Sequence, residues 1–151
     1  MKIGLVTITF NSADVLPEFL DSVAKQTYQN FFLYVIDNAS TDNTIQEFEF
    51  RKKQNYQLIP NKNNLGVAAG NNQGIKKALF EDCDFVLLIN NDTVFEEKLL
   101  QKLVDAYHQY GSSIITPKMM YYESNNVIWY AGGFFDRKKA WLNYHLSLIH
   151  I

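Results

Sequence analysis

The sequence predicts an α/β fold, a three-layer sandwich with a mostly parallel central sheet, and two observations lead to that prediction. First, short apolar runs rich in branched and aromatic side chains alternate with amphipathic helical patterns along most of the chain. Strands and helices in that alternation favour a parallel sheet with right-handed crossovers. Second, residues 85–89 are apolar without interruption, which is typical of a strand buried on both faces of a parallel sheet.

The elements are expected in a regular order. A first strand over residues 2–10 suits the centre of the sheet, and apolar residues recur on one face of a helix over 14–26. Further strands are predicted over 31–36, 56–59, 85–89 and 112–116, and further helices around Ile45 and Phe48, over 67–79 and over 99–110. Beyond residue 118 the helical alternation stops, and residues 127–136 predict two strands around a Gly-Gly bend.

Composition bounds the class of protein. With 151 residues, 47% of them hydrophobic and 20% charged, the chain suits one globular domain or a large part of a bigger one. A formal net charge of −2 argues against a nucleic-acid or anionic-membrane surface. No apolar run is long enough to span a bilayer, and we find no secretory signal. The single cysteine, Cys83, is expected to be a buried, reduced thiol, which fits the cytoplasm.

The placement of glycines argues against one common nucleotide fold. No glycine-rich turn separates the first strand from the first helix, whereas a dinucleotide-binding turn needs glycines for close approach to the pyrophosphate. Glycines occur instead inside the third helix, at Gly70 and Gly74, where each costs about 1 kcal/mol against alanine. That cost predicts a close approach at this helix, either to the sheet or to a ligand.

Three polar clusters follow successive strands of the predicted sheet. They are Thr9-Phe10-Asn11, Asp37-Asn38 and Asn90-Asn91-Asp92. Because the carboxyl ends of parallel strands meet at one edge, the clusters should share a crevice, which predicts a pocket for a nucleotide or phosphorylated ligand. Asp92, flanked by amides, has the oxygen ligands that a hard cation prefers. Each cluster also has an alternative interpretation as a turn or a helix cap.

Four motifs in order give a more specific signal. They are T-I-T-F-N-S at 7–12, D-N-A-S-T-D-N-T at 37–44, N-L-G at 64–66 with G-N-N-Q-G-I at 70–75, and L-I-N-N-D-T at 88–93. With these motifs the chain resembles the family 2 glycosyltransferases, and among them the rhamnosyltransferase-like branch. The resemblance runs from about residue 2 to residue 93 and continues weakly through residues 129–133.

The resemblance implies a fold and an activity. The fold would be the GT-A arrangement of nucleotide-diphospho-sugar transferases, with a nucleotide-sugar-binding half at 1–118 and the start of an acceptor-binding half at 119–151. The activity would be inverting, metal-dependent transfer of a hexosyl or rhamnosyl group from a UDP- or dTDP-linked donor to a glycan or lipid-linked acceptor, as in polysaccharide biosynthesis. The alternative is a module that binds a nucleotide or nucleotide sugar without transfer. We expect a cytoplasmic protein without a nucleic-acid partner, and enzymes of this kind can associate peripherally with the inner face of a membrane.

The resemblance also assigns site residues, position by position. Thr9 and Asn11 are expected to line the base, and Asp37 to accept a hydrogen bond from the ring imide, a role that suits an acceptor-only carboxylate. Asp42 is expected to form a second polar wall, with a helix-start acid as the alternative. Further contacts to the nucleotide sugar are expected from Asn38, Asn64, Gly66, Asn72 and Asn91.

A metal site is implied as well. Asp92 matches the last acid of the family's D-x-D motif, and Asn90 occupies the first acid position. These two residues are expected to hold Mg²⁺ or Mn²⁺ against the donor diphosphate, where the cation neutralises charge on the leaving group. Because Asn90 contributes an amide oxygen and no charge, we expect the metal affinity to be weaker than with two acids.

No general base is expected within this chain. An inverting transfer needs a base for the acceptor hydroxyl, and in the resembled family that acid lies further along, in the acceptor half. Asp136 is the only acid after Asp92 that we consider for the role. The chain ends in an apolar segment, so we expect a truncated acceptor half that is inactive alone, with residues 147–151 a candidate non-native extension.

Overall fold

The structure is a computed structural model that describes residues 1–124, 126–136 and 141–144. Two compact units make up the chain, Met1–Leu100 and Gln101–Ile151. Each unit is described by itself below.

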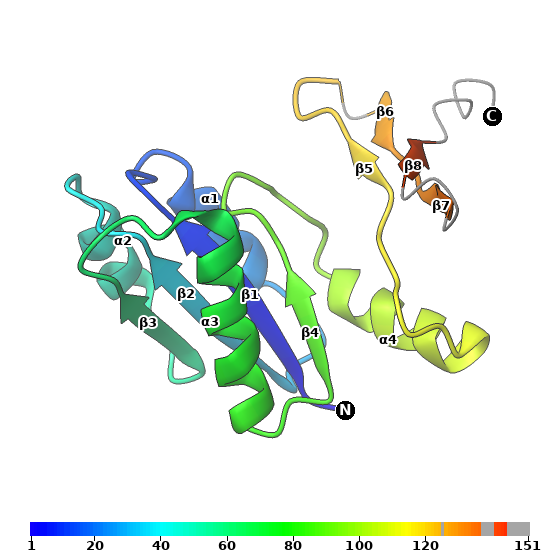
Figure 1. The fold of residues 1–151 in the computed structure, drawn as a ribbon, viewed down its shortest axis with the longest axis horizontal. Helices are drawn as coiled ribbons and strands as arrows, with labels where there is room; N and C mark the ends of the chain where they lie inside the picture. The colour runs from blue at the N-terminus through cyan, green and yellow to red at the C-terminus, as the bar shows by residue number, and fades with distance from the viewer. Residues whose placement is uncertain (125, 137–140, 145–151) are drawn as a thin grey trace. The chain divides into compact units, whose positions relative to one another are not determined.

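The first unit is built around a four-stranded parallel sheet in the order β3-β2-β1-β4. The strands are β1 (Ile3–Thr9), β2 (Phe31–Asp37), β3 (Tyr56–Pro60) and β4 (Phe85–Leu88). The helices are α1 (Leu16–Ala24), α2 (Thr44–Arg51) and α3 (Gly66–Phe80), and α4 (Leu99–Tyr110) begins at the end of this unit. Helix α3 covers one face of the sheet while α1 and α2 lie on the other (Figure 1). The three-layer α/β sandwich is therefore confirmed.

Strand β1 is central, as its apolar sequence predicts. It pairs with β2 on one side and β4 on the other, and Leu5 and Val6 are completely buried. The register pairs Thr9 with Asp37, so the last residues of β1 and β2 lie side by side. That register brings the polar clusters after these two strands to the same edge of the sheet.

Strand β4 departs from the prediction of burial on both faces. Its first three residues are half-buried and Leu88 is exposed. The physical reason is its place at the edge of the sheet, where it pairs with β1 alone. An unbroken apolar run is therefore compatible with an edge strand, and the sequence does not reveal the strand order.

The two glycines inside α3 lie against the sheet. A Cβ atom added to Gly74 would lie 2.2 Å from Cγ1 of Val6, and one added to Gly70 would lie 3.1 Å from Cδ1 of Ile8. Both glycines are buried. Of the two alternatives left open by the sequence, close approach to the sheet is the one found. The helix can pack this closely on β1 because these two positions have no side chain.

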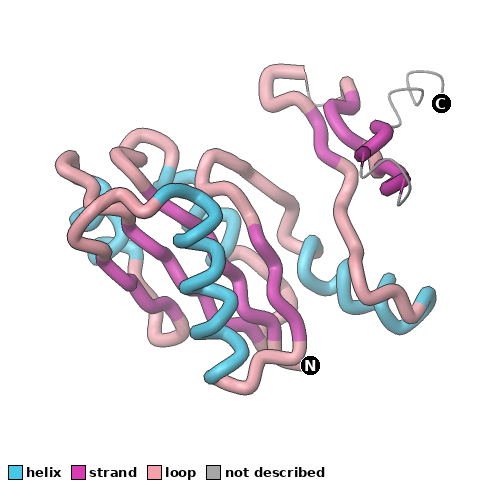
Figure 2. The backbone as a smooth tube through the Cα atoms, in the orientation of Figure 1, coloured by secondary structure: helices cyan, strands magenta, loops and turns pink. Residues whose placement is uncertain are grey.

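The second unit contains two short antiparallel strand pairs, drawn in magenta in Figure 2. Strand β5 (Met119–Met120) pairs with β6 (Ile128–Tyr130), and β7 (Gly133–Asp136) pairs with β8 (Trp141–Tyr144). The predicted strands on either side of the Gly-Gly bend are present as β6 and β7. The predicted strand at 112–116 is wrong, because this segment has no strand partner and Ile114 is 88% exposed.

The other predictions about organisation have mixed outcomes. The functional division after residue 118 stays a prediction, and residues 147–151 lie outside the described part of the chain. Cys83 is buried, as expected. In the described residues, no helix has the length and apolar character that crossing a bilayer requires.

Candidate functional site

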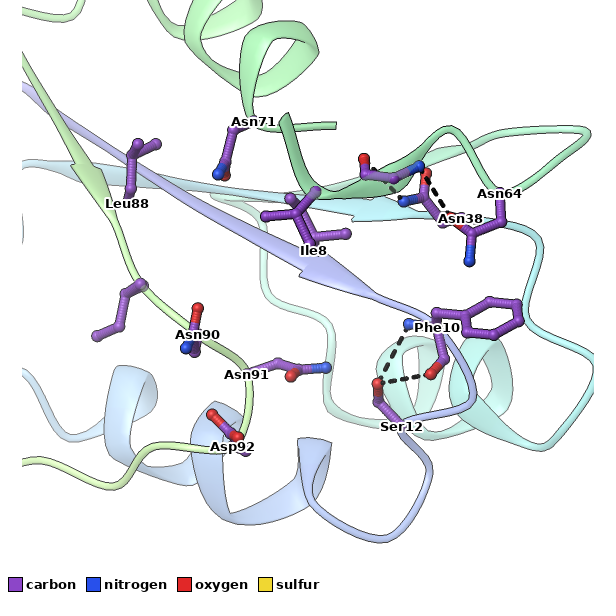
Figure 3. A pocket seen from close by; sticks show the side chains of 13 residues that line it. Ile8, Phe10, Ser12, Asn38, Asn64, Asn71, Leu88, Asn90, Asn91 and Asp92 are labelled. Atoms are coloured by element: carbon purple, nitrogen blue, oxygen red, sulfur yellow. Dashed lines mark hydrogen bonds between the residues drawn. The ribbon is translucent and has the colours of Figure 1, made fainter. Parts of the chain in front are cut away.

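A cavity of about 440 Å³ lies at the carboxyl edge of the parallel sheet, within the first unit (Figure 3). It is lined by Ile8, Phe10, Ser12, Asn38, Asn64, Gly66, Val67, Asn71, Leu88, Ile89, Asn90, Asn91 and Asp92. Segments far apart in sequence contribute to it, since the lining comes from the ends of β1, β2 and β4 and from the start of α3. The structure thus brings six of the expected site residues to one cavity: Asn38, Asn64, Gly66, Asn90, Asn91 and Asp92.

Asp37 and Thr9 are buried and are not among the residues that line this cavity. Thr9 is fully buried and Asp37 is 1% exposed. The Asp37 carboxylate accepts the Thr9 hydroxyl at 2.8 Å, the Ser40 hydroxyl at 2.5 Å and the Ser40 N–H at 2.9 Å. A carboxylate has about four acceptor positions, so internal donors occupy most of them. In this structure Asp37 holds the loops after β1 and β2 together, and its contact with a base stays a prediction.

Asn11 and Asp42 also connect these two loops rather than line the cavity. The Asn11 side-chain oxygen accepts the Thr41 N–H at 2.8 Å, and the Asn11 N–H donates to Ser40 at 2.9 Å. The Asp42 carboxylate accepts the N–H groups of Ala13 and Thr44, each at 3.0 Å. These bonds place Asp42 as an acid just before α2, and its role as a second polar wall for the nucleotide stays a prediction.

The hydrogen bonds of Asp42 also change its acidity. Partial desolvation by burial opposes ionisation, but the Thr44 hydroxyl and the N–H groups of Ala13 and Thr44 together hold the pKa of Asp42 below its ordinary value. The carboxylate is thereby kept charged at the positive end of α2, where a negative charge is favourable.

The start of α3 forms one wall of the cavity. Gly66 adopts a φ of +77° that favours glycine, and its N–H donates to the Asn64 side chain at 2.9 Å. The N-cap residue Leu65 makes no side-chain cap, so apart from this Asn64 contact the positive end of α3 meets the cavity at Gly66 and Val67. One helical turn after Val67, Asn71 lines the cavity, whereas the expected Asn72 is exposed and outside it. The phase of the helix therefore turns Asn71 toward the cavity and Asn72 away from it, and a contact between Asn72 and the nucleotide sugar stays a prediction.

Asp92 and its neighbours form the opposite wall. Asp92 is exposed, and no hydrogen bond or ion pair engages its carboxylate among the residues that the structure describes. The nearby Asn91 side-chain nitrogen is buried without a hydrogen-bond partner. In Figure 3 the side chains of Asn90, Asn91 and Asp92 project from the loop that follows β4. This loop offers amide and carboxylate groups that no other part of the first unit uses.

The donor set fits a hard cation that is shared with a phosphate ligand. In the described part of the chain, no three His, Cys, Asp or Glu side chains gather into a closed metal cage. Mg²⁺ characteristically keeps water ligands and binds through one or two carboxylates together with substrate phosphates. One free carboxylate with adjacent amide oxygens therefore suits a cation that a diphosphate helps to hold.

The loop after Asp92 is fastened to the end of α1 by Gln26. This side chain is 1% exposed, donates to the Glu96 carbonyl at 2.8 Å and accepts the Leu100 N–H at 3.1 Å. Beside it, the N–H of Thr27 donates to the Glu97 carbonyl at 2.8 Å. These bonds fix the chain between Asp92 and α4, and so limit how far the loop can move.

Sequence reasoning missed the apolar and aromatic part of the lining. Phe10 is 49% exposed at the end of the cavity opposite Leu88 (Figure 3), and the other apolar lining residues are Ile8, Val67, Leu88 and Ile89. Phe10 stands in the middle of the polar cluster Thr9-Phe10-Asn11. An aromatic side chain among polar ones was the signal that could have identified it.

Asp136, the one acid considered as a general base, lies in β7 of the second unit. No catalytic role is assigned to it.

Comparison with known proteins shows what this arrangement is similar to. The family model described as Glycosyl transferase family 2 matches residues 5–149. The chain is 23% identical over 130 residues to Glycosyltransferase GlyG of Streptococcus pneumoniae, covering 85% of this chain and 42% of that protein. It is 29% identical over 123 residues to poly(ribitol-phosphate) beta-N-acetylglucosaminyltransferase TarS of Staphylococcus aureus, covering 79% of this chain and 21% of that protein. The chain spans less than half the length of either relative.

Solved structures confirm the fold. Staphylococcus aureus TarS 1–349 in complex with UDP-GlcNAc matches with a TM-score of 0.67 at 26% identity, over 81% of this chain and 38% of that one. The mannosyltransferase PcManGT of Pyrobaculum calidifontis, in complex with GDP-Man and Mn²⁺, matches with a TM-score of 0.65 at 21% identity, over 70% of this chain and 32% of that one. The mostly parallel sheet with flanking helices is thus the GT-A arrangement.

Proposed function

This chain belongs to glycosyl transferase family 2, and we propose that it is the donor-binding portion of an inverting, metal-dependent glycosyltransferase. The donor is a nucleotide-diphosphate sugar, UDP- or dTDP-linked, and the acceptor is a glycan or a lipid-linked glycan. The observation that carries the proposal is the cavity at the carboxyl edge of the sheet, which the free Asp92 carboxylate and the start of α3 both line.

The two walls of this cavity suit a diphosphate that is contacted from two sides. A cation held by Asp92 and the Asn90 amide oxygen would neutralise phosphate charge from one side. The positive end of α3, at Gly66 and Val67, attracts the same anion from the other. With the diphosphate between these walls, the base would extend toward Phe10 and Asn38, at the opposite end of the cavity from Leu88 (Figure 3).

Mg²⁺ or Mn²⁺ is the proposed cation, and its chemistry is Lewis-acid stabilisation of the departing nucleoside diphosphate. Two of the compared proteins support the ligands, since TarS is known with UDP-GlcNAc and PcManGT with GDP-Man and Mn²⁺. The chain's own residues would support this site in two ways. Gln26 and Thr27 hold the loop that carries Asn90 and Asp92 in place, and the Asp92 carboxylate is left free of partners in the described residues.

The transfer step is proposed for the whole protein and not for this chain alone. The chain covers 42% of GlyG and 21% of TarS, and we propose that the general base lies in the acceptor half beyond it. The second candidate function is a module that binds a nucleotide sugar without transfer. We expect this chain to bind UDP-GlcNAc and to release no UDP from it, and steady UDP release would contradict the assignment of the base beyond residue 151.

Calorimetry tests the donor and metal site directly. UDP and dTDP are titrated into the chain with and without Mn²⁺, and Mn²⁺ is expected to tighten binding at least about tenfold, as a charge pair at the diphosphate should. Asp92→Ala is expected to abolish that gain. Asp14→Ala is the matched control, because Asp14 is an exposed acid of the same unit that lies outside the cavity.

Three outcomes would contradict the proposal in different places. If the wild-type chain binds neither nucleotide, the donor site is wrong. If the nucleotides bind with the same affinity with and without Mn²⁺, the metal is not part of the donor site. Should Asp92→Ala and Asp14→Ala respond to Mn²⁺ alike, the metal is held elsewhere.

A further inference from the structure

Gln26 is a buried amide just beyond the end of α1, and it does not line the cavity. Its nitrogen donates to the Ser22 carbonyl at 3.1 Å and to the Glu96 carbonyl at 2.8 Å, and its oxygen accepts the Leu100 N–H at 3.1 Å. Carbonyls only accept and an N–H only donates, so this orientation of the amide is the one that forms all three bonds. One side chain thereby joins α1 to both ends of the segment 96–100.

The metal loop, residues 89–95, is attached to a different element at each end. At its start, the Ile89 N–H donates to the Val6 carbonyl of β1 at 3.0 Å. Directly after its end, the Glu96 carbonyl accepts from Gln26. A segment attached at one end alone keeps much of its conformational freedom, so the attachment at Gln26 confines the loop.

The position of Asp92 depends on these backbone attachments. Its carboxylate has no partner among the described residues. Within the loop, the Thr93 hydroxyl donates to the Asn90 carbonyl at 2.7 Å, which closes a turn around Asp92. That turn fixes Asp92 relative to Asn90, but its place at the sheet edge is set where the loop is attached. A cation shared with a diphosphate needs both ligand groups in place at once.

Thr27 provides a second attachment that is more exposed. Its N–H donates to the Glu97 carbonyl at 2.8 Å, but Thr27 is exposed, so water competes for that carbonyl. The bond from Leu100 to Gln26 is buried. Without the Gln26 amide, the buried Leu100 N–H would lack a partner, and moving the segment toward water would relieve that cost. Gln26 is therefore the attachment whose loss should displace the loop.

We propose that Gln26 is a positioning residue for the metal site, and that its bonds to Glu96 and Leu100 set how strongly Asp92 and the diphosphate share a cation. The inference rests on the proposed function, which places the cation at Asp92. Coupling of this kind is reciprocal. If the Gln26 bonds strengthen binding of the metal-bound nucleotide, that ligand must strengthen the Gln26 bonds by the same factor.

Gln26→Met tests the first half of this coupling. Methionine has a similar length and volume, but it cannot donate and its sulfur is a weak acceptor. UDP is titrated calorimetrically with and without Mn²⁺, and the ratio of the two affinities is the Mn²⁺ gain. We expect the gain to fall from about tenfold in the wild type to less than about threefold in Gln26→Met. The affinity for UDP without Mn²⁺ should stay within about twofold, because the side-chain bonds of Gln26 do not reach the start of α3.

Gln46→Met is the matched control for the substitution. Gln46 is exposed on α2 and outside the cavity, so this variant should keep the Mn²⁺ gain of the wild type. Thermal unfolding of both variants shows whether each is folded at the temperature of the titration.

Hydrogen exchange of the wild-type chain tests the second half and needs no variant. The exchange rate of the Leu100 N–H is measured by NMR at saturating UDP, with and without Mg²⁺, which is diamagnetic and so leaves the signal sharp. We expect Mg²⁺ to slow this exchange at least about threefold, the factor that Gln26 contributes to metal binding. The Glu81 N–H, which donates to the Lys77 carbonyl at 3.1 Å at the far end of α3, is the control amide and should change less. If Gln26→Met does not fold, this measurement decides.

The outcomes separate this inference from the proposed function. A wild-type chain that does not bind UDP, or that shows no Mn²⁺ gain, overturns the proposed metal site and this inference together. With a normal gain in the wild type, the inference alone fails if folded Gln26→Met keeps the gain of Gln46→Met. It also fails if Gln26→Met weakens UDP binding equally with and without Mn²⁺, or if Mg²⁺ leaves the exchange of the Leu100 N–H unchanged.

Discussion

Two aspartates at the carboxyl edge of the sheet have opposite surroundings. Asp37 is 1% exposed and accepts hydrogen bonds from Thr9 and Ser40, whereas Asp92 is exposed and its carboxylate has no partner in the described residues. Burying a carboxylate is unfavourable unless donors surround it, so Asp37 is suited to ordering two loops. A free carboxylate is suited to binding a cation. The two aspartates are chemically identical, and the presence or absence of surrounding hydrogen-bond donors suits one to ordering loops and the other to binding a cation.

Asp42 provides a prediction about pH at the scale of one residue. Its pKa in the folded chain is below its ordinary value, so the ionised carboxylate stabilises the fold above the pKa of the unfolded chain. This contribution is lost as pH falls through the folded-state pKa. We expect Asp42→Asn to lower the free energy of unfolding by about 1 kcal/mol at pH 7, because the amide loses the negative charge and one of the two acceptor oxygens that Ala13 and Thr44 use. The difference should shrink toward zero between about pH 5 and pH 2.

Denaturant unfolding of both proteins across this pH range makes the measurement. Asp14→Asn serves as a control, because Asp14 is exposed at the surface before α1. A variant as stable as the wild type at pH 7 would show that the bonds to Ala13 and Thr44 contribute nothing net. A stability difference that does not change with pH would show that the lost charge is not its cause.

At the scale of elements, the position of α3 depends on two residues without side chains. Gly70 and Gly74 let this helix lie directly on β1, and the helix start then faces the cavity at Gly66 and Val67. The contact of these two glycines with the sheet also fixes which side of α3 faces the cavity. With Gly70 and Gly74 against the sheet, Asn71 is turned toward the cavity and Asn72 toward solvent.

Gly74→Ala tests this packing. The new Cβ would lie 2.2 Å from Cγ1 of Val6, and overpacking of this kind costs about 1–3 kcal/mol. That cost should exceed the gain of about 1 kcal/mol in helix propensity. We expect a lower melting temperature and a lower free energy of unfolding. In a Val6→Ala background, which removes the clashing methyl groups, the same substitution should cost clearly less.

Gly70→Ala is the matched control within the same helix. Its added Cβ would meet the Ile8 side chain at 3.1 Å, at the flexible end of that chain, so a smaller loss is expected. Equal losses at both positions, or a Gly74→Ala cost unchanged by Val6→Ala, would show that contact with Val6 does not set the distance between α3 and the sheet.

At the scale of the whole molecule, the alternation of strands and helices was sufficient to predict the layers, the parallel sheet and the shared edge of the polar clusters. Strand order was not predictable, because pairing depends on contacts between segments far apart in the chain. Strand β4 therefore lies at the edge of the sheet although its sequence is as apolar as that of β1. The segment 112–116, with Ile114 and Ile115 at its centre, likewise has no strand to pair with.

The candidate site was predictable to the level of motifs and not to the level of contacts. Asn38, Asn64, Gly66 and the Asn90–Asp92 cluster line the cavity, because each lies in a segment that follows a strand or leads into a helix at the same edge. Asn11 and Asp42 belong to equally polar motifs, yet their side chains bond to neighbouring loops. Which polar side chains satisfy one another can be decided only after the loops are placed in space.

The cavity is formed entirely by the first compact unit, and this division provides a prediction for the whole molecule. All of its lining residues lie within Met1–Leu100. A chain ending after Gly111 keeps that unit and the whole of α4, whose end is closed by the bond from the Gly111 N–H to the Tyr107 carbonyl at 2.8 Å. We expect this shorter chain to unfold cooperatively and to bind UDP with Mn²⁺ within about threefold of the 151-residue chain. Circular dichroism melting and calorimetry make the comparison, and a shorter chain that unfolds without cooperativity, or loses UDP binding that the longer chain retains, would show that residues 112–151 are needed to form the site.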